Sequence, residues 1–278
     1  MIISVASGKG GTGKTTIATS LALSLGNVQF LDCDVEEPNA HIFLKPQIRK
    51  KISVGIPVPE VDQSKCNYCG KCAQVCEFNA IVVLKKKVLF FPELCHGCGG
   101  CSYICPEKAI KETTREIGVI EKGTSKGIDF SHGVLNVGEP MAPPLIKQVK
   151  KLITNKRTTI IDASPGTSCP VVETVKDTDF CLLVTEPTPF GLNDLKLAVE
   201  MLRKLAIPFG VVINCADIGD EEVERYCERE GIQIMMTIPW DRRIAEAYST
   251  GIPLIEALPD YQNKFYQLYK TIERLSKR

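Results

Sequence analysis

Two groups of residues in this chain have types and spacings that could do chemistry. The first is a glycine-rich loop at residues 7–16 (SGKGGTGKTT), which ends in a lysine and two threonines. The second is a cluster of cysteines between residues 66 and 105. Glycine loops of this type bind phosphate through backbone N–H groups, and clustered cysteines in a reducing compartment bind metal. The sequence therefore predicts a phosphate site and a metal-binding segment.

The glycine-rich loop lies between an apolar run at residues 2–6 and a run of small and apolar residues at 15–25. This order predicts a buried strand, a phosphate-binding turn and a helix that begins near Lys14, and residues 8–15 fit the P-loop pattern G-x-x-x-x-G-K-[ST]. Lys14 is expected to reach the β- and γ-phosphates of ATP or ADP, and the Thr15 hydroxyl to ligate Mg²⁺. The residues expected to surround the phosphates are Gly8, Gly10, Gly11, Thr12, Gly13, Lys14, Thr15 and Thr16.

Each of three later apolar runs is followed by acidic or amide side chains. Asp32 and Asp34 follow the run at 28–31, Asp162 follows 159–161, and Asn214 follows 209–213. Because the carboxyl ends of parallel strands meet at the ligand-binding edge of a sheet, we expect these side chains near the phosphate loop.

Residues 9–16 also match K-G-G-x-G-K-T-[ST] at every fixed position. The chain therefore resembles the deviant Walker A ATPases of the MinD/Mrp type. The resemblance implies that Lys9 crosses a dimer interface and touches the nucleotide of the other subunit. A second lysine beside one triphosphate is excess charge for a monomer, which favours a shared site on electrostatic grounds as well. The implied partner is a second copy of the chain or a similar subunit, joined in an ATP-dependent dimer.

The same resemblance assigns roles to the strand-end residues. Asp34 is implied to orient the attacking water, Asp32 to support the Mg²⁺ shell, and Asp162 to hold Mg²⁺ through water. The N–H of Gly166 is implied to sense the γ-phosphate. The catalytic set for ATP hydrolysis is then Lys9, Lys14, Asp34 and Asp162. Contacts with the adenine base are implied for Asn214, Pro239 and Asp241.

The cysteine segment is an internal repeat in which each run reads C-x₂-C-x₂-C-x₃-C and the second lies 29 residues after the first. Bacterial ferredoxins with two [4Fe–4S] clusters have this spacing, and the fourth cysteine of each run ligates the other cluster. One cluster is expected on Cys66, Cys69, Cys72 and Cys105, and the other on Cys95, Cys98, Cys101 and Cys76. Zinc competes for C-x₂-C pairs, but the doubled spacing favours iron–sulfur.

The regular α/β pattern stops near residue 48, where lysine and proline become frequent, and resumes near residue 114. This change predicts a linker and an insertion. Residues 1–55 and 114–278 are expected to form one α/β P-loop ATPase domain, with a mostly parallel sheet flanked by helices. Residues 56–113 are expected to form an inserted small α+β ferredoxin-like domain. An insertion of about 50 residues is too small to fold on a hydrophobic core alone, so its clusters would act as its core.

The composition excludes several other classes of protein. A net charge of +1 over 278 residues gives no indication of nucleic-acid or anionic-membrane binding. No apolar run approaches the roughly 20 residues of a transmembrane helix, and the N-terminus does not resemble a secretory signal, so a cytoplasmic location is expected. Residues 261–278 have apolar residues at helical spacing, and we expect this helix to pack on the sheet rather than on a membrane.

One cysteine outside the repeat needs separate treatment. Cys169 follows Asp162 by seven residues, the spacing at which the nitrogenase iron protein, a relative in this superfamily, places a ligand of a cluster shared by two subunits. No second cysteine occurs in the matching region, residues 138–145, so a structural or interfacial role is favoured.

The leading hypothesis is an ATP-driven dimeric switch that changes the exposure, docking or potential of two clusters toward an unidentified redox partner. The first alternative is an iron–sulfur cluster carrier or assembly ATPase, although a late C-x-x-C pair typical of Mrp-type carriers is absent from the sequence. The second alternative is a MinD-like positioning ATPase.

Overall fold

The computed structural model describes residues 1–154 and 156–276, and the chain divides into two compact units. The first unit comprises Met1–Lys51, Ile120–Val134 and Ile146–Arg278. The second comprises Ile52–Val119 and Leu135–Leu145, and it contains all eight cysteines of the repeat. The last two residues of the helix expected at 261–278 lie outside the described residues.

The described part of the chain contains a sheet of nine strands, with the order β11-β10-β9-β1-β8-β2-β7-β6-β3. Most of this sheet belongs to the first unit, but residues 52–61 of β3 and 110–119 of β6 belong to the second. Pairing is parallel from β11 through β1 and β8 to β2 and β7. The strand bounds are β1 (Ile2–Ala6), β2 (Gln29–Asp32), β3 (Gln47–Val61), β6 (Ile110–Ser125), β7 (Ile128–Leu135), β8 (Thr159–Asp162), β9 (Phe180–Thr185), β10 (Phe209–Asn214) and β11 (Ile234–Ile238). This confirms the expected mostly parallel sheet.

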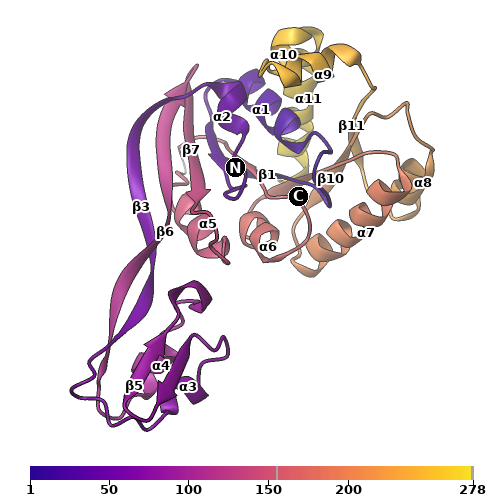
Figure 1. The fold of residues 1–278 in the computed structure, drawn as a ribbon. Helices are drawn as coiled ribbons and strands as arrows, with labels where there is room; N and C mark the ends of the chain where they lie inside the picture. The colour runs from indigo at the N-terminus through magenta and orange to yellow at the C-terminus, as the bar shows by residue number, and fades with distance from the viewer. Residues whose placement is uncertain (155, 277–278) are drawn as a thin grey trace. The chain divides into compact units, whose positions relative to one another are not determined.

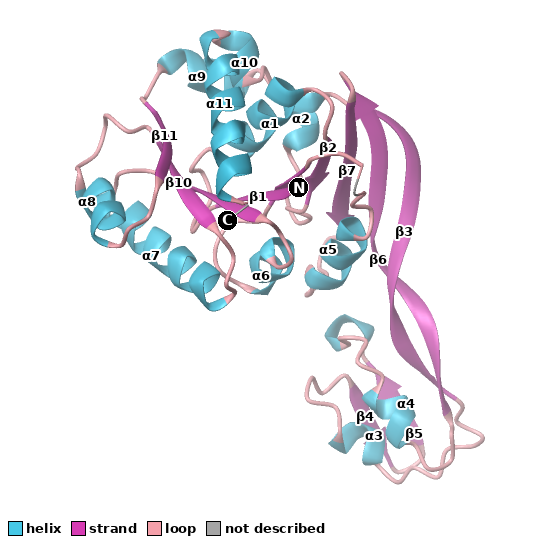
Figure 2. Cartoon of the chain, turned by 180° about the vertical axis from the view of Figure 1, so that it is seen from behind, coloured by secondary structure: helices cyan, strands magenta, loops and turns pink. Residues whose placement is uncertain are grey.

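Helices cover both faces of the parallel part of the sheet (Figures 1 and 2). Helices α1, α2, α10 and α11 lie on one face, and α6, α7 and α8 on the other, where each set packs against its own cluster of buried side chains. The helix bounds are α1 (Lys14–Leu25), α2 (Ala40–Leu44), α5 (Pro143–Lys150), α6 (Cys169–Val175), α7 (Pro189–Lys204), α8 (Glu222–Arg229), α9 (Arg242–Ser249), α10 (Leu254–Ala257) and α11 (Asp260–Leu275).

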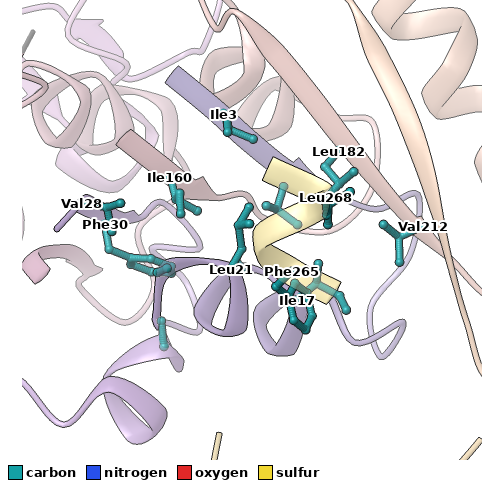
Figure 3. Close-up of a cluster of buried hydrophobic side chains, with 14 of the residues drawn as sticks. Ile3, Ile17, Leu21, Val28, Phe30, Ile160, Leu182, Val212, Phe265 and Leu268 are labelled. Atoms are coloured by element: carbon teal, nitrogen blue, oxygen red, sulfur yellow. The ribbon is translucent and has the colours of Figure 1, made fainter. Parts of the chain in front are cut away.

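The central strands are buried on both faces, which explains their continuous apolar sequences. Ile3 of β1, Ile17 and Leu21 of α1, and Phe265 of α11 belong to one core cluster, and Figure 3 shows these side chains beneath the sheet. Because Phe265 and Ile272 are fully buried there, the apolar face of α11 packs on the sheet, as expected from the sequence. None of the helices in the described residues is long and apolar enough to cross a membrane.

The region expected to be a linker after residue 48 is instead part of the 15-residue strand β3, which pairs with β6. A side chain at Gly55 would meet the backbone of Arg115, and one at Gly123 would meet Gln47, so the two strands run antiparallel. The start of β3 is exposed and basic (QIRKK), and the strand later contains Pro57 and Pro59. Lysine and proline are typical of edge strands, and β3 is the last strand of the sheet, so the linker prediction was wrong.

The second unit has little regular structure of its own. It contains the hairpin of β4 (Ile81–Leu84) and β5 (Lys87–Phe90), the short helices α3 (Lys71–Gln74) and α4 (Gly100–Ile104), and a 3₁₀ turn at Pro92–Leu94. Its small apolar cluster centres on four buried residues, Cys72, Ile81, Val88 and Ile110. Such a core is too small to stabilise the unit alone, which is consistent with a need for metal.

Candidate functional site

The glycine-rich loop joins β1 to α1, and the helix begins at Lys14 as the sequence predicts. Gly11 and Gly13 have φ values of 82° and 87°, a region that glycine adopts at little cost. A side chain at Gly13 would lie 2.6 Å from the amide nitrogen of Asn214, so the loop also needs glycine there for space. Inside the loop, the Ser7 hydroxyl donates to the Lys9 carbonyl at 2.7 Å.

Carboxylates from neighbouring strands meet this loop. Asp162 at the end of β8 is aligned with Val5 of β1 on one side and with Asp32 of β2 on the other. Both carboxylates are fully buried. The parallel register therefore brings residues that are far apart in the sequence to the same edge of the sheet, as we expected.

Lys14 and Thr15 both contact Asp162. The Lys14 ammonium lies 2.9 Å from Asp162 Oδ1, and the Thr15 hydroxyl donates to Oδ2 at 2.6 Å. Asp34 lies 3.7 Å from the same ammonium. Burial lowers the pKa of Lys14, but the charges of Asp162 and Asp34 outweigh burial, so the pKa is raised and the lysine stays charged.

Asp32 positions the chain that follows it. Its two oxygens accept hydrogen bonds from the N–H groups of Asp34 at 3.0 Å and Ala40 at 3.1 Å, which fixes the segment between β2 and α2. Burial, together with the charge of Asp162, raises the pKa of Asp32 well above its usual value. Burial also raises the pKa of Asp34 to about 6, although the charge of Lys14 opposes this. Asp32, Asp34 and Asp162 thus lie close together, and a cation bound among them would favour their charged forms.

The loop after β8 contacts the phosphate loop directly. The Gly166 N–H, expected to sense a γ-phosphate, donates to the Ser7 carbonyl at 2.9 Å, and Gly166 has a φ of 98°. Helix α6 begins three residues later at Cys169, whose side chain is exposed. The loop of Gly166 therefore joins the phosphate loop to the start of α6.

Lys9 makes an ion pair within its own chain. Its ammonium lies 3.1 Å from the carboxylate of Glu186, which follows β9. Glu186 was not predicted from the sequence as part of the site. The signal that could have found it is an acidic side chain at the end of a buried strand: Glu186 directly follows β9, Asp162 ends β8, and Asp34 comes shortly after β2.

The residues expected at the adenine base are held in two different ways. The Asn214 amide donates to the Thr12 carbonyl at 3.0 Å, so it supports the phosphate loop. Asp241 accepts from the Arg243 N–H at 2.8 Å as the N-cap of α9, and it also pairs with the Arg243 guanidinium. Pro239 lies between β11 and this cap. The structure therefore brings Asn214 to the loop, while the Asp241 side chain is committed to capping a helix.

The eight repeat cysteines line two cavities in the second unit. The first cavity is lined by Cys66, Cys69, Cys72 and Cys105, and the second by Cys76, Cys95, Cys98 and Cys101. In each case the last cysteine of one run lies with three from the other run. The chain is thus folded so that each cavity has four sulfur atoms in its wall.

Backbone N–H groups point at four of these sulfurs, and the pattern repeats every 29 residues. Tyr68 donates to Cys66 and Gly97 to Cys95, both at 3.4 Å. The same bond, at 3.3 Å, joins Ala80 to Cys76 and Ala109 to Cys105. Such bonds stabilise thiolate charge and lower the energy of a metal-bound sulfur.

Within the described residues, no group of three or more His, Cys, Asp or Glu side chains is spaced to hold a single metal ion. A single zinc ion needs sulfur atoms at about 2.3 Å from one centre. A [4Fe–4S] cube binds each sulfur at a different corner and needs wider spacing.

Residues 3–254 match the CbiA family model, described as the CobQ/CobB/MinD/ParA nucleotide binding domain. The chain belongs to this nucleotide-binding family. The α/β P-loop fold expected from the sequence is thereby confirmed.

Individual relatives agree with this assignment. An uncharacterised protein from Methanocaldococcus jannaschii is 34% identical, with coverage of 90% of each chain. A protein named iron-sulfur cluster carrier protein from Pyrococcus abyssi is 25% identical over 91% of this chain and 78% of its own length. The septum site-determining protein MinD from Pyrococcus horikoshii, solved with Mg-ADP, has a TM-score of 0.63 and 20% identity over 99% of this chain and 96% of that one, which supports the fold.

Replacing Thr15 should show how much its hydroxyl contributes to the site. Thr15→Val keeps the shape but leaves Asp162 Oδ2 without its donor in a buried site, so we expect a loss of about 1–3 kcal/mol in the free energy of unfolding. Thr15→Ser keeps the hydroxyl and should lose less than about 1 kcal/mol. Urea denaturation of the nucleotide-free protein, followed by circular dichroism, measures both. Equal losses in the two variants would show that the hydrogen bond is not the cause.

Proposed function

We propose that this chain is an ATP-driven dimeric switch that controls electron transfer by two [4Fe–4S] clusters. The observation that carries this proposal is the presence, in one chain, of a P-loop with buried carboxylates and of two cavities with four cysteines each. The family match supports the nucleotide-binding half, and the names of relatives support an association with iron–sulfur clusters.

ATP hydrolysis depends on positioning and charge. Lys14 would neutralise the phosphates, and Thr15 and Asp162 would hold Mg²⁺ with the support of Asp32, where the ion would supply charge stabilisation to the phosphates. The Asp34 carboxylate orients the water that attacks the γ-phosphorus, and the bond to the ADP oxygen breaks. The existing contacts of Lys14 and Thr15 with Asp162 place these groups together before nucleotide binds, which lowers the cost of ordering the site.

The dimer is proposed to form through Lys9. In the single chain its charge is neutralised by Glu186. When ATP is bound in a facing subunit, the triphosphate offers a stronger partner for the ammonium, and Lys9 exchanges Glu186 for it. The second copy thus contributes a charged group that each site lacks by itself.

The cysteines in the first cavity would hold one cluster and those in the second the other, and the clusters would supply one-electron transfer when bound. The chain's own contribution is the thiolate set and the N–H donors to Cys66, Cys76, Cys95 and Cys105. These donors stabilise negative charge at the sulfurs and favour retention of a cluster.

A second candidate function is the carriage of clusters to other proteins. It is favoured by the name of the Pyrococcus abyssi relative, iron-sulfur cluster carrier protein. Against it stands the closed set of four cysteines around each cavity, because a carrier needs a ligand set that releases its cargo. A positioning role like that of MinD rests on structural likeness at 20% identity, which supports the fold alone.

The cysteine assignment can be tested by iron content. Cys105→Ala removes one ligand from the first cavity, so the purified anaerobic protein should fall from about eight to about four iron atoms per chain. Cys101→Ala should lose the other half. Cys169→Ala is the control: its exposed thiol lies outside both cavities, and iron content should stay unchanged. Loss of all iron in Cys105→Ala, with the fold intact by circular dichroism, would contradict independent sites.

The two candidate functions make opposite predictions about cluster retention. For a redox switch, the reduced protein's EPR signals or midpoint potentials should change when ATP is added with Mg²⁺, and both clusters should remain after incubation with an apo-ferredoxin. For a carrier, ATP should instead increase transfer of iron and sulfide to the acceptor. If the EPR signals and midpoint potentials do not change when ATP and Mg²⁺ are added, the proposed switch is overturned.

The role of Lys9 can be tested with variants of Lys9 and of Glu186, its ion-pair partner. Lys9→Ala should weaken the ATP-dependent dimer by about 10- to 100-fold, the effect of losing a hydrogen bond to a charged group. Glu186→Gln frees Lys9 and should strengthen the dimer by up to about fivefold, because a partly exposed ion pair contributes about 1 kcal/mol or less.

Analytical ultracentrifugation with ATP and Mg²⁺ measures both effects. Lys204→Ala and Glu200→Gln serve as controls, since they break a similar 2.8 Å pair on the exposed face of α7 and should leave the dimer unchanged. A dimer that forms equally well in Lys9→Ala would rule out the shared site.

A further inference from the structure

The β4–β5 hairpin of the second unit has an outer face that is apolar and open to solvent. Alternate residues of a strand point to opposite faces, and the cross-strand pairs Val82 with Leu89 and Leu84 with Lys87 share one of them. On this face Val82 is 39% exposed and Leu84 is 49% exposed. The hairpin therefore presents a short apolar strip that the described residues leave partly uncovered.

The opposite, inner face of the same hairpin forms part of the wall of both cysteine cavities. Its cross-strand pairs are Ile81 with Phe90 and Val83 with Val88. Val83 and Val88 line the first cavity, and Ile81 and Phe90 line the second. The outer face is therefore separated from each cavity by a single two-stranded layer.

The tip of the hairpin carries three consecutive lysines. Lys85 and Lys86 make the two-residue turn, and Lys87 begins β5. All three are exposed, and in the part of the chain that the structure describes none of them forms an ion pair. Like charges on neighbouring residues repel one another, and lysine is not a residue that two-residue hairpin turns require. The hairpin itself therefore gives no reason for this charge.

The internal repeat shows that the cysteine fold does not require the charge either. The backbone bond from Phe91 to Ala80 has its counterpart, through the 29-residue shift, in the bond from Asp62 to Ala109. The same shift relates the three lysines to residues 114–116 (TRE) of β6, where one positive and one negative charge cancel. The two strand pairs are thus equivalent in the fold, but only the hairpin has an uncompensated positive tip.

A positive tip beside an apolar strip fits one kind of partner, a protein surface with carboxylates next to an apolar patch. Interfaces combine an apolar centre with a polar rim, and opposite charges on the two rims increase the association rate and the specificity. An anionic membrane would be attracted by the same lysines. However, Val82 and Leu84 offer much less apolar surface than the face of a membrane-binding amphipathic helix, which favours a protein.

We propose that this hairpin surface, made of Val82, Leu84, Lys85, Lys86, Lys87 and Leu89, docks an acidic one-electron carrier protein. The inference rests on the proposed function, because it gives the redox partner a chemistry and a place. A carrier docked there lies against the layer that walls both cavities. One electron then passes between a bound cluster and the carrier's cofactor, so that one is oxidised as the other is reduced.

Binding of an acidic flavodoxin to the anaerobic, iron-loaded protein tests the role of the charge. The triple variant Lys85→Gln, Lys86→Gln and Lys87→Gln keeps the side-chain polarity but removes the charge. At low salt its Kd should be about 10- to 100-fold higher than that of the wild type, since each exposed ion pair contributes up to about fivefold. The dependence of Kd on salt concentration should also become weaker. Biolayer interferometry at several salt concentrations measures both.

A matched control separates local charge from net charge. Lys45, Lys50 and Lys151 are exposed lysines of the first unit, and replacing all three with glutamine changes the net charge by the same amount. This control variant should change Kd less than about twofold, because charges outside an interface are screened by salt. Leu84→Ala tests the apolar strip: it should raise Kd severalfold and leave the salt dependence unchanged.

Three results would overturn the docking surface. They are the absence of flavodoxin binding by the wild type at low salt, equal binding by the lysine variant and the control variant, and lysine-dependent binding to phosphatidylserine vesicles but not to flavodoxin. Cytochrome c, a basic one-electron carrier, should bind at least about tenfold more weakly than flavodoxin. Equal affinity for the two carriers would also contradict an acidic partner.

The docking surface and the proposed function can fail separately. If the lysine variant loses flavodoxin binding while the clusters do not respond to ATP, the docking surface stands and the switch is refuted. If the clusters respond to ATP while flavodoxin binding does not depend on the lysines, the docking surface alone is refuted.

Discussion

The first unit, called here the nucleotide-binding unit, contains the P-loop, and the position of this loop depends on the buried contact between Lys14 and Asp162. An ammonium with 7% exposure is costly to bury unless carboxylates neutralise it, and Asp162 at 2.9 Å and Asp34 at 3.7 Å do so. The same carboxylate accepts from Thr15, so one residue at the end of β8 fixes two residues at the start of α1. This arrangement requires β1, β2 and β8 to be parallel and in register, because a shift of one residue would turn Asp162 to the other face of the sheet.

The second unit, which contains the eight repeat cysteines, has a different kind of core. Its apolar cluster has few members, and two of its partly buried neighbours, Cys66 and Cys105, are among the residues of the first cavity. Sulfur atoms thus take positions that aliphatic side chains hold in a larger domain. The backbone pairs repeat as the cysteines do: Asp62 donates to Ala109 and Phe91 to Ala80, which are related by the 29-residue shift. The repeat in sequence is therefore also a repeat in structure, and it explains why the fourth cysteine of each run lies with the other run.

Strands β3 and β6 each contain residues of both units. Strands β3 and β6 have 15 and 16 residues, and both begin or end inside the nucleotide-binding unit.

Local patterns in the sequence determined the phosphate loop, the start of α1 and the grouping of the cysteines. Each depends on residues within a short stretch, where glycine conformation, helix initiation and ligand spacing leave few alternatives. The edge strand β3 was not recognised, because its basic and proline-rich sequence resembles a linker unless its place in the sheet is known.

Only the tertiary structure decided the partners of charged groups. Lys9 meets Glu186 from a distant part of the chain, and Arg115 meets Glu139 across a separation of 24 residues. Asn214 reaches Thr12 from another strand. Such contacts follow from strand order and register, which a single sequence constrains weakly, since many pairings bury the same apolar residues equally well. The phosphate-binding and cysteine motifs could be predicted from local spacing. The ion pairs and hydrogen bonds of their charged and polar side chains depend on the packed fold.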